Sequence, residues 1–195
     1  MDLKARAKKL LALYREFEEK ARAYRESAVC GVGCADCCIN VGSVDAVTLE
    51  GWIILERMKA MEPGRRSRLK QRIEDNARIK RESTYTRCAF LLDNLSCAIY
   101  PVRPFSCRRL YSLVRCGEQG PTVHRQVWQM GEETIAGIQE LDDGGYFGHL
   151  SHILQLLQDP PFRKAYLSGS SADEAMRKCG HAGDLFISRI RRRLK

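Results

Sequence analysis

The chain has 195 residues and a formal net charge of +9, with 33 Lys and Arg against 24 Asp and Glu. This length is typical of one domain, so we expect residues 1–195 to form a single one. The nine cysteines, about 5 % of the residues, exclude a small secreted disulfide scaffold by their low share and odd number. Without a secretory signal or a run of about 18 apolar residues, the sequence predicts a cytoplasmic protein with no membrane partner. In that reducing setting, clustered cysteines are metal ligands or catalytic thiols rather than disulfides.

The first predicted element is a long helix over residues 2–26. Apolar residues recur along it at spacings of three and four, and charged residues fill the other face. The apolar stripe consists of Leu3, Ala7, Leu10, Tyr14, Phe17, Ala21 and Tyr24. A stripe of this length has to pack on something. We expect it to dock on its own domain, with a coiled-coil or homodimer seam as the alternative.

A first cysteine group follows this helix, in the spacing Cys30-x3-Cys34-x2-Cys37-Cys38. Thiolate is the soft ligand of zinc and of iron–sulfur clusters, and closely spaced cysteines on a turn can converge on one ion. Neighbouring side chains of an extended chain point to opposite sides. We therefore expect Cys37 and Cys38 to differ, with one of them facing a second group.

Two further helices are predicted next, one from Thr48 to Met61 that ends before Pro63-Gly64, and a more polar one through Leu69, Ile73 and Ala77. Much of the positive charge lies in two basic runs, at 65–72 and 189–195. Neither run carries the interleaved aromatic residues of a nucleic-acid surface. We interpret both as solvated helix faces and expect no nucleic-acid partner.

Residues 87–100 break the helical pattern, because two short apolar runs flank the turn sequence Asp93-Asn94. This predicts a small β-hairpin. The hairpin and the loop after it carry the second cysteine group, Cys88, Cys97, Cys107 and Cys116. Forty-nine residues lie between Cys38 and Cys88. A site that joins the two groups would lock the hairpin onto the N-terminal loop and couple metal binding to folding.

The second cysteine segment is rich in arginine and has Asp93 as its only acid. Its arginines are Arg87, Arg103, Arg108, Arg109 and Arg115. They can offset the negative charge of thiolates, present an anion-binding surface, or be ordinary surface residues. The sequence leaves these three interpretations open.

Helices return in the C-terminal part, near residues 122–141, 146–158, 161–168, 171–179 and 183–194. Ser171 and Glu174 form a capping box, and Gly180 fits the position after a helix end. The predicted fold class is therefore mostly α: a helical domain with one small β-hairpin and cysteine-rich metal-binding loops.

Three residues of this part invite a functional reading that we do not adopt. His149 and His152 would share one face of a helix, but no Cys or Glu lies near them in sequence, so we assign them to the helix surface. Cys179 lies away from both cysteine groups, and we interpret it as an ordinary thiol.

The cysteine motifs resemble those of a known family. Cys34-x2-Cys37-Cys38 is followed by Arg87-Cys88-Ala-Phe-Leu, Cys97-Ala-Ile-Tyr100 and Arg103-Pro-Phe-Ser-Cys107-Arg108. Over about residues 30–117 this order is similar to the CxxCxxCC cysteine-cluster family of YkgJ type, zinc- or iron-chelating proteins related to flagellin lysine N-methylase. Cys30 departs from the family pattern, because three residues rather than two precede the next cysteine. The resemblance implies metal binding.

Both the spacing and the resemblance predict a metal site, holding an iron–sulfur cluster or zinc, from Cys30, Cys34, Cys37, Cys38, Cys88, Cys97, Cys107 and Cys116. The spacing of the first three also matches radical S-adenosylmethionine enzymes, but Asp36 stands where they carry an aromatic, and no repeated βα units are evident. We expect a metal-binding cysteine-cluster protein. The alternative is an S-adenosylmethionine-dependent lysine N-methyltransferase acting on a protein substrate. No catalytic residue or methyl-donor pocket is evident from the sequence, so enzymatic activity stays open.

Overall fold

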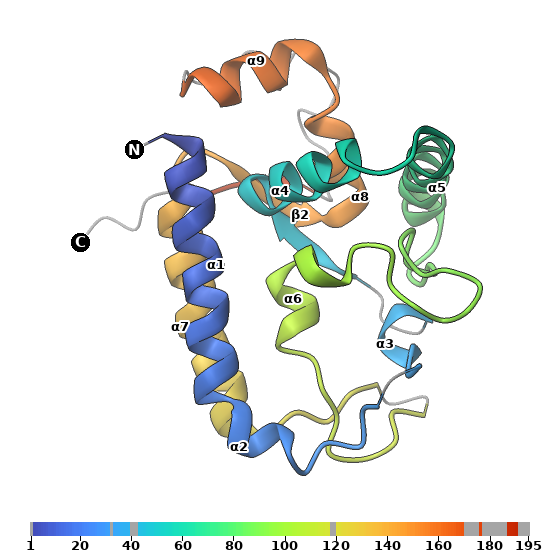
Figure 1. The fold of residues 1–195 in the computed structure, drawn as a ribbon, viewed down its shortest axis with the longest axis vertical. Coiled ribbons are helices and arrows are strands. Elements are labelled where there is room, and N and C mark those ends of the chain that lie inside the picture. The colour runs from blue at the N-terminus through green and yellow to red at the C-terminus, as the bar shows by residue number, and fades with distance from the viewer. Residues whose placement is uncertain are drawn as a thin grey trace.

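The computed structural model describes residues 2–31, 33–39, 43–117, 120–169, 176 and 187–190. Over these ranges the fold is mostly α, as predicted (Figure 1). The helices are α1 (Leu3–Lys20), α2 (Arg22–Arg25), α3 (Asp36–Ile39), α4 (Thr48–Lys59), α5 (Pro63–Glu82), the 3-10 turn η1 (Tyr100–Val102), α6 (Phe105–Arg108), α7 (Arg125–Leu141), α8 (Leu150–Leu156) and α9 (Pro160–Ser168). The strands are β1 (Asp45–Val47), β2 (Tyr146–His149) and β3 (Ile187–Arg189).

The N-terminal helix packs within its own chain. Asp2 caps α1 by accepting a hydrogen bond from the Ala5 N–H at 2.7 Å. The helix predicted over 2–26 is divided at Ala21 into α1 and α2. Leu10, Tyr14 and Phe17 are buried in a core with residues of α4, α6 and α7. Figure 1 shows α1 and α7 running side by side. The apolar stripe thus forms one wall of the core.

A three-stranded antiparallel sheet was not predicted. β2 lies between β1 and β3, with Ala46 opposite Gly148 and Phe147 opposite Ser188. The prediction of helix was therefore wrong at 146–149 and at 187–189. These strands have three or four residues and pair with partners far away in the chain, so local periodicity does not reveal them. The capping box at Ser171 and Glu174, and the assignments of Gly180 and Cys179, lie outside the described residues.

The turn predicted within residues 87–100 is present. A single β-bridge joins Leu91 to Cys97, and the Leu92 N–H donates to the Ser96 carbonyl at 2.8 Å. The apolar residues Phe90 and Ile99 are buried against α4, α5 and α8. The hairpin is shorter than expected because its apolar side chains pack on helices rather than extend the ladder.

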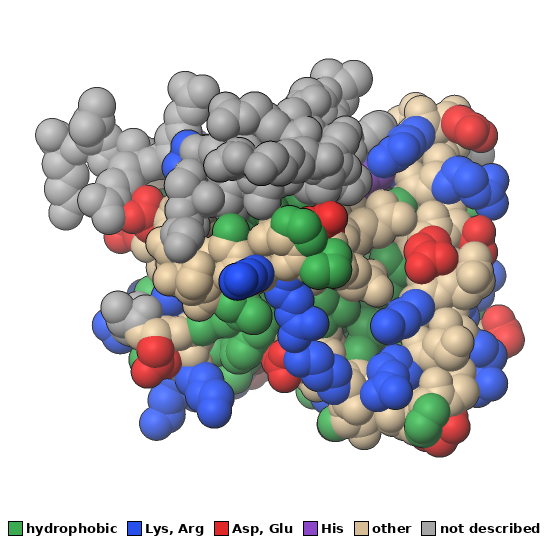
Figure 2. Space-filling model, turned by 90° about the horizontal axis from the view of Figure 1, so that it is seen from above, with side chains coloured by type: hydrophobic (Ala, Val, Ile, Leu, Met, Phe, Trp, Pro, Cys, Tyr) green, Lys and Arg blue, Asp and Glu red, His purple; other side chains and the backbone are tan. Residues whose placement is uncertain are grey.

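The first basic run has the solvated helix setting expected of it, whereas in the second run Arg189 is exposed on β3 rather than on a helix, and residues 191–195 lie outside the described part of the chain. Lys and Arg side chains are spread over the face seen in Figure 2, with Asp and Glu side chains among them. In the first basic run, Arg65, Arg68 and Lys70 are exposed on α5. Among the described helices, none is long and apolar enough to cross a membrane.

Candidate metal centre

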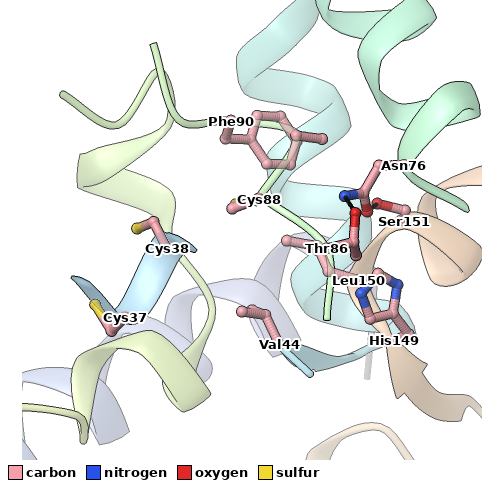
Figure 3. A pocket seen from close by; sticks show the side chains of 11 residues that line it. Cys37, Cys38, Val44, Asn76, Thr86, Cys88, Phe90, His149, Leu150 and Ser151 are labelled. Atoms are coloured by element: carbon pink, nitrogen blue, oxygen red, sulfur yellow. Dashed lines mark hydrogen bonds between the residues drawn. The ribbon is translucent and has the colours of Figure 1, made fainter. Parts of the chain in front are cut away.

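The short helix α3 determines how the first cysteines are presented. The N–H groups of Cys38 and Ile39 both donate to the Ala35 carbonyl, at 2.8 and 3.1 Å. In a helical turn, consecutive side chains are about 100° apart rather than on opposite sides. Cys37 and Cys38 therefore line the same cavity, together with Cys88 (Figure 3). One of these neighbours was expected to face the second cysteine group, and both line the cavity with Cys88, because the chain here is a helical turn rather than extended.

The hairpin segment docks directly on this helix. The Cys88 N–H donates to the Cys38 carbonyl at 2.8 Å. The two cysteine groups, separated by 49 residues in sequence, are thus joined by the backbone itself. This places the thiols of the hairpin beside those of α3.

A buried carboxylate holds α6, which carries Cys107, against the core. Glu50 at the start of α4 accepts hydrogen bonds from the Phe105 N–H at 2.7 Å, the Val47 N–H at 2.8 Å and the Tyr14 hydroxyl at 2.5 Å. Burial raises the pKa of Glu50 above its ordinary value, and these three donors oppose that shift. The loop before Cys107 is thereby fixed to α1 and α4.

Five thiols form one group in space, which we call the five-thiol group: Cys37, Cys38, Cys88, Cys97 and Cys107. Each pair among Cys37, Cys88, Cys97 and Cys107 lies close enough for one thiol to influence the pKa of the other. Cys38 joins them through a hydrogen bond to Cys37. The group draws on three segments of the chain, α3, the hairpin and α6.

The thiols of the five-thiol group differ in how readily they lose their protons. The hydrogen bond from Cys38 lowers the pKa of Cys37 to about 7, although burial opposes it. Burial raises the pKa of Cys88 to about 11, and it also raises the pKa values of Cys97 and Cys107. Cys37 is thus the thiol of this group that ionises most readily, while Cys88 keeps its proton at neutral pH.

Arg103 is the arginine that faces these thiols. Its charge lowers the pKa values of Cys37, Cys97 and Cys107. The guanidinium lies 3.8 Å from the centroid of the Tyr100 ring, which orients it. Of the three interpretations that the sequence leaves open, the offset of thiolate charge fits Arg103.

The neighbouring arginines instead hold the loop. Arg108 donates to the Arg103 carbonyl at 3.0 Å, to the Pro101 carbonyl at 2.7 Å and to Glu18 at 2.7 Å. Arg109 pairs with Glu132 at 2.6 Å. Arg108 thus holds the loop from η1 to α6 in place, because its planar guanidinium donates hydrogen bonds to several acceptors at once.

A second thiol group lies apart from the first. Cys116 is near enough to Cys30, Cys34 and Asp36 for their charges to raise its pKa, a shift caused chiefly by burial. The Ser112 N–H donates to the Cys30 sulfur at 3.2 Å. Cys30 and Cys34 are exposed. The cysteines therefore group differently in space than in sequence. Cys116 lies near Cys30 and Cys34, whereas Cys37 and Cys38 of α3 lie with the cysteines of the hairpin and α6.

The donors suit zinc or iron, but they do not stand ready at bonding distance. Across the described ranges, no three His, Cys, Asp or Glu side chains lie close enough together to hold one ion. Thiolate sulfur is nevertheless the ligand that both metals favour, and a protein zinc or cluster site takes about four such donors. Metal binding by the five-thiol group thus requires its side chains to turn inward.

The cavity beside the thiols has a polar far wall. Its volume is about 10 Å³, which is room for about one water molecule. On this wall, Asn76 donates to the Thr86 hydroxyl at 3.2 Å and accepts a hydrogen bond from the Ser151 hydroxyl. Figure 3 shows this network on the side opposite Cys37 and Cys38, with His149 next to it.

His149 is not on a helix surface, so that prediction was wrong. It is the last residue of β2, its exposed fraction is 6 %, and it lines the cavity. Its Nδ1 atom is buried without a hydrogen-bond partner. Burial lowers the pKa of His149 to about 4, with help from His152 and Lys80, so the ring is neutral at neutral pH. His152 is also buried. Only the aromatic pair at 146–147, a weak strand signal, could have pointed to this placement.

A comparison with known protein families gives a match over the cysteine-containing part of the chain. A family model named CxxCxxCC, described as a putative zinc- or iron-chelating domain, matches residues 29–129. This range contains both thiol groups. No curated protein and no solved structure matches the chain.

Proposed function

Since the chain belongs to the CxxCxxCC family of zinc- or iron-chelating domains, we propose that its five-thiol group binds zinc or iron, as a single ion or as an iron–sulfur cluster. The observation that carries this proposal is the convergence of thiols from α3, the hairpin and α6 beside Arg103. A structural or storage role suits a protein whose thiolates come from three segments, because ligation then fastens those segments together.

The chain's own residues prepare the site for a metal. The hydrogen bond from Cys38 lowers the pKa of Cys37, which eases the loss of the proton that metal ligation requires. Arg103 offsets part of the negative charge that further ionisation creates. Cys37, Cys38, Cys88, Cys97 and Cys107 would hold the metal, which would supply a Lewis acid that stabilises their thiolates.

The second group, Cys30, Cys34 and Cys116, is a weaker candidate. Two of its three thiols are exposed, and it provides one sulfur fewer than a four-thiolate site. We expect it to bind metal less tightly than the five-thiol group. The lysine methyltransferase alternative rests on the resemblance alone and forms no part of this proposal.

The experiment is metal analysis of protein purified without oxygen, by mass spectrometry and visible absorption. Bound zinc gives a colourless protein, and an iron–sulfur cluster gives a brown one. The double variant Cys37→Ser/Cys88→Ser should lose the metal, while the matched variant Cys30→Ser/Cys34→Ser should keep most of it. Wild-type protein that holds neither metal, or a Cys37→Ser/Cys88→Ser variant with full metal content, contradicts the proposal.

A further inference from the structure

His149 is a buried donor that no hydrogen bond explains. The side chain is 6 % exposed, and its Nδ1 atom has no hydrogen-bond partner although it is buried. An unpaired buried polar atom is unfavourable, so a native structure seldom keeps one without a reason. An ion or a water in the adjoining space is such a reason.

The adjoining space is the cavity that three thiols share with this imidazole. Cys37, Cys38 and Cys88 line it together with His149. Figure 3 shows the two cysteines of α3 on one side with their sulfur atoms turned away from His149, which lies on the other side with Val44 between them. The volume of about 10 Å³ admits roughly one water-sized particle, so a single ion fits the cavity, and its donors reach bonding distance only when the side chains turn inward.

The remaining polar groups of the cavity are already occupied. Ser151 donates to Asn76, and Asn76 donates to Thr86 and, at 2.7 Å, to the Arg87 carbonyl. These hydrogen bonds use the side chains that would otherwise compete for His149. The His149 imidazole is therefore the nitrogen donor that is left available on the side of the cavity opposite the thiols of α3.

We propose, resting on the proposed function above, that the metal binds in this cavity and that His149 is its nitrogen ligand, with Cys37, Cys38 and Cys88 as its sulfur ligands. Three thiolates and one imidazole are an established donor set for tetrahedral zinc. The competing set is the four thiols of Cys37, Cys88, Cys97 and Cys107. Of these, Cys97 and Cys107 are absent from the cavity lining.

The position of His149 suits the closing movement that ligation requires. It ends β2, whose register places it opposite Asp45 of β1, and it precedes α8. The ring is thus carried by the sheet and does not move easily. The thiols of the four-residue helix α3, which has no buried residue, are the side chains that approach it.

The test is X-ray absorption at the cobalt edge of protein loaded with one equivalent of Co²⁺ alone. Wild-type protein should show three sulfur ligands and one imidazole nitrogen. His149→Gln should lose the imidazole signal and weaken Co²⁺ binding by about 10-fold or more. His124→Gln is the matched control, because the His124 Nδ1 atom is also buried and unpaired but its ring lies on Tyr24, away from the cavity. The control should bind Co²⁺ as wild type does.

Cysteine variants separate the two donor sets without changing a histidine. Cys38→Ser should remove one sulfur from the first shell, and Cys97→Ser should leave the shell intact. A first shell of four sulfurs that changes with Cys97→Ser but not with His149→Gln overturns this inference while supporting metal binding. Wild-type protein that binds no Co²⁺ overturns the proposed function as well. Circular dichroism of each metal-free variant shows whether it is folded.

Discussion

Replacing Phe17 by Ala should destabilise the protein and, through α6, weaken the metal centre. Phe17 is 2 % exposed on α1, and its ring meets the Phe105 ring edge-on at a centroid distance of 4.8 Å. Phe105 begins α6, the helix that carries Cys107. The substitution therefore opens a cavity directly beneath one segment of the five-thiol group.

The loss of stability caused by Phe17→Ala follows from the burial of the ring. Removing a fully buried phenyl ring costs about 3–5 kcal/mol, which includes the transfer and cavity contributions. For a chain of this length, each kcal/mol lowers the melting temperature by about 2–4 °C. The expected decrease for Phe17→Ala is therefore roughly 6–20 °C.

Thermal unfolding followed by circular dichroism measures this decrease, with Phe147→Ala as the matched control. Phe147 lies on β2 and is 37 % exposed, so its loss should cost about 1 kcal/mol or less. If Phe17→Ala melted within about 3 °C of the wild-type protein, where each kcal/mol is worth about that much, α1 would not be part of the core as described.

Three further outcomes are expected. Burial raises the pKa of Asp142 from 3.8 to about 6, so the folded state binds this proton more tightly than the unfolded state, and the free energy of unfolding should fall as pH rises through that interval. Urea titrations should show this slope in wild-type protein and lose it in Asp142→Asn; an unchanged slope refutes the assignment. Arg108→Lys should lower the free energy of unfolding by about 1–3 kcal/mol, because one ammonium cannot donate to two carbonyls and Glu18 at the same time. An unchanged free energy of unfolding in urea titration would show that Arg108 does not hold this loop in place. Removing the metal with a chelator should reduce amide-hydrogen protection over 30–39 and 87–116 more than in α1 and α7; a uniform change would show that the metal supports the whole fold.

Local periodicity predicted the helices well, because the apolar residues of a buried helix face recur every three or four positions in the sequence. The stripe through Leu10 and Phe17 is buried as its spacing requires, and the helix expected from Thr48 ends at Lys59, shortly before Pro63. The strands were missed because each is short and gains its hydrogen bonds from distant segments. The Tyr146 backbone, for example, exchanges hydrogen bonds with the Thr48 hydroxyl at 2.7 and 3.0 Å, a pairing that no local pattern contains.

The sequence predicted the chemistry of the site, but it did not predict which cysteines lie together in the folded chain. Clustered cysteines and the family motifs pointed to metal, which the family match supports. Which thiols meet depends on the helical turn at Cys37 and on the docking of Cys88 against Cys38, and both are features of the folded backbone. His149 was misplaced because its neighbours in the cavity come from α3, α5 and the hairpin, all distant in sequence.

The most direct test of the metal centre is an anomalous-scattering map from crystals of natively purified protein, measured at the zinc and iron absorption edges. We expect a strong peak between α3 and the hairpin, within bonding distance of the Cys37 and Cys88 sulfurs. A map without a peak there, or with its main peak at Cys30, Cys34 and Cys116, would contradict this expectation.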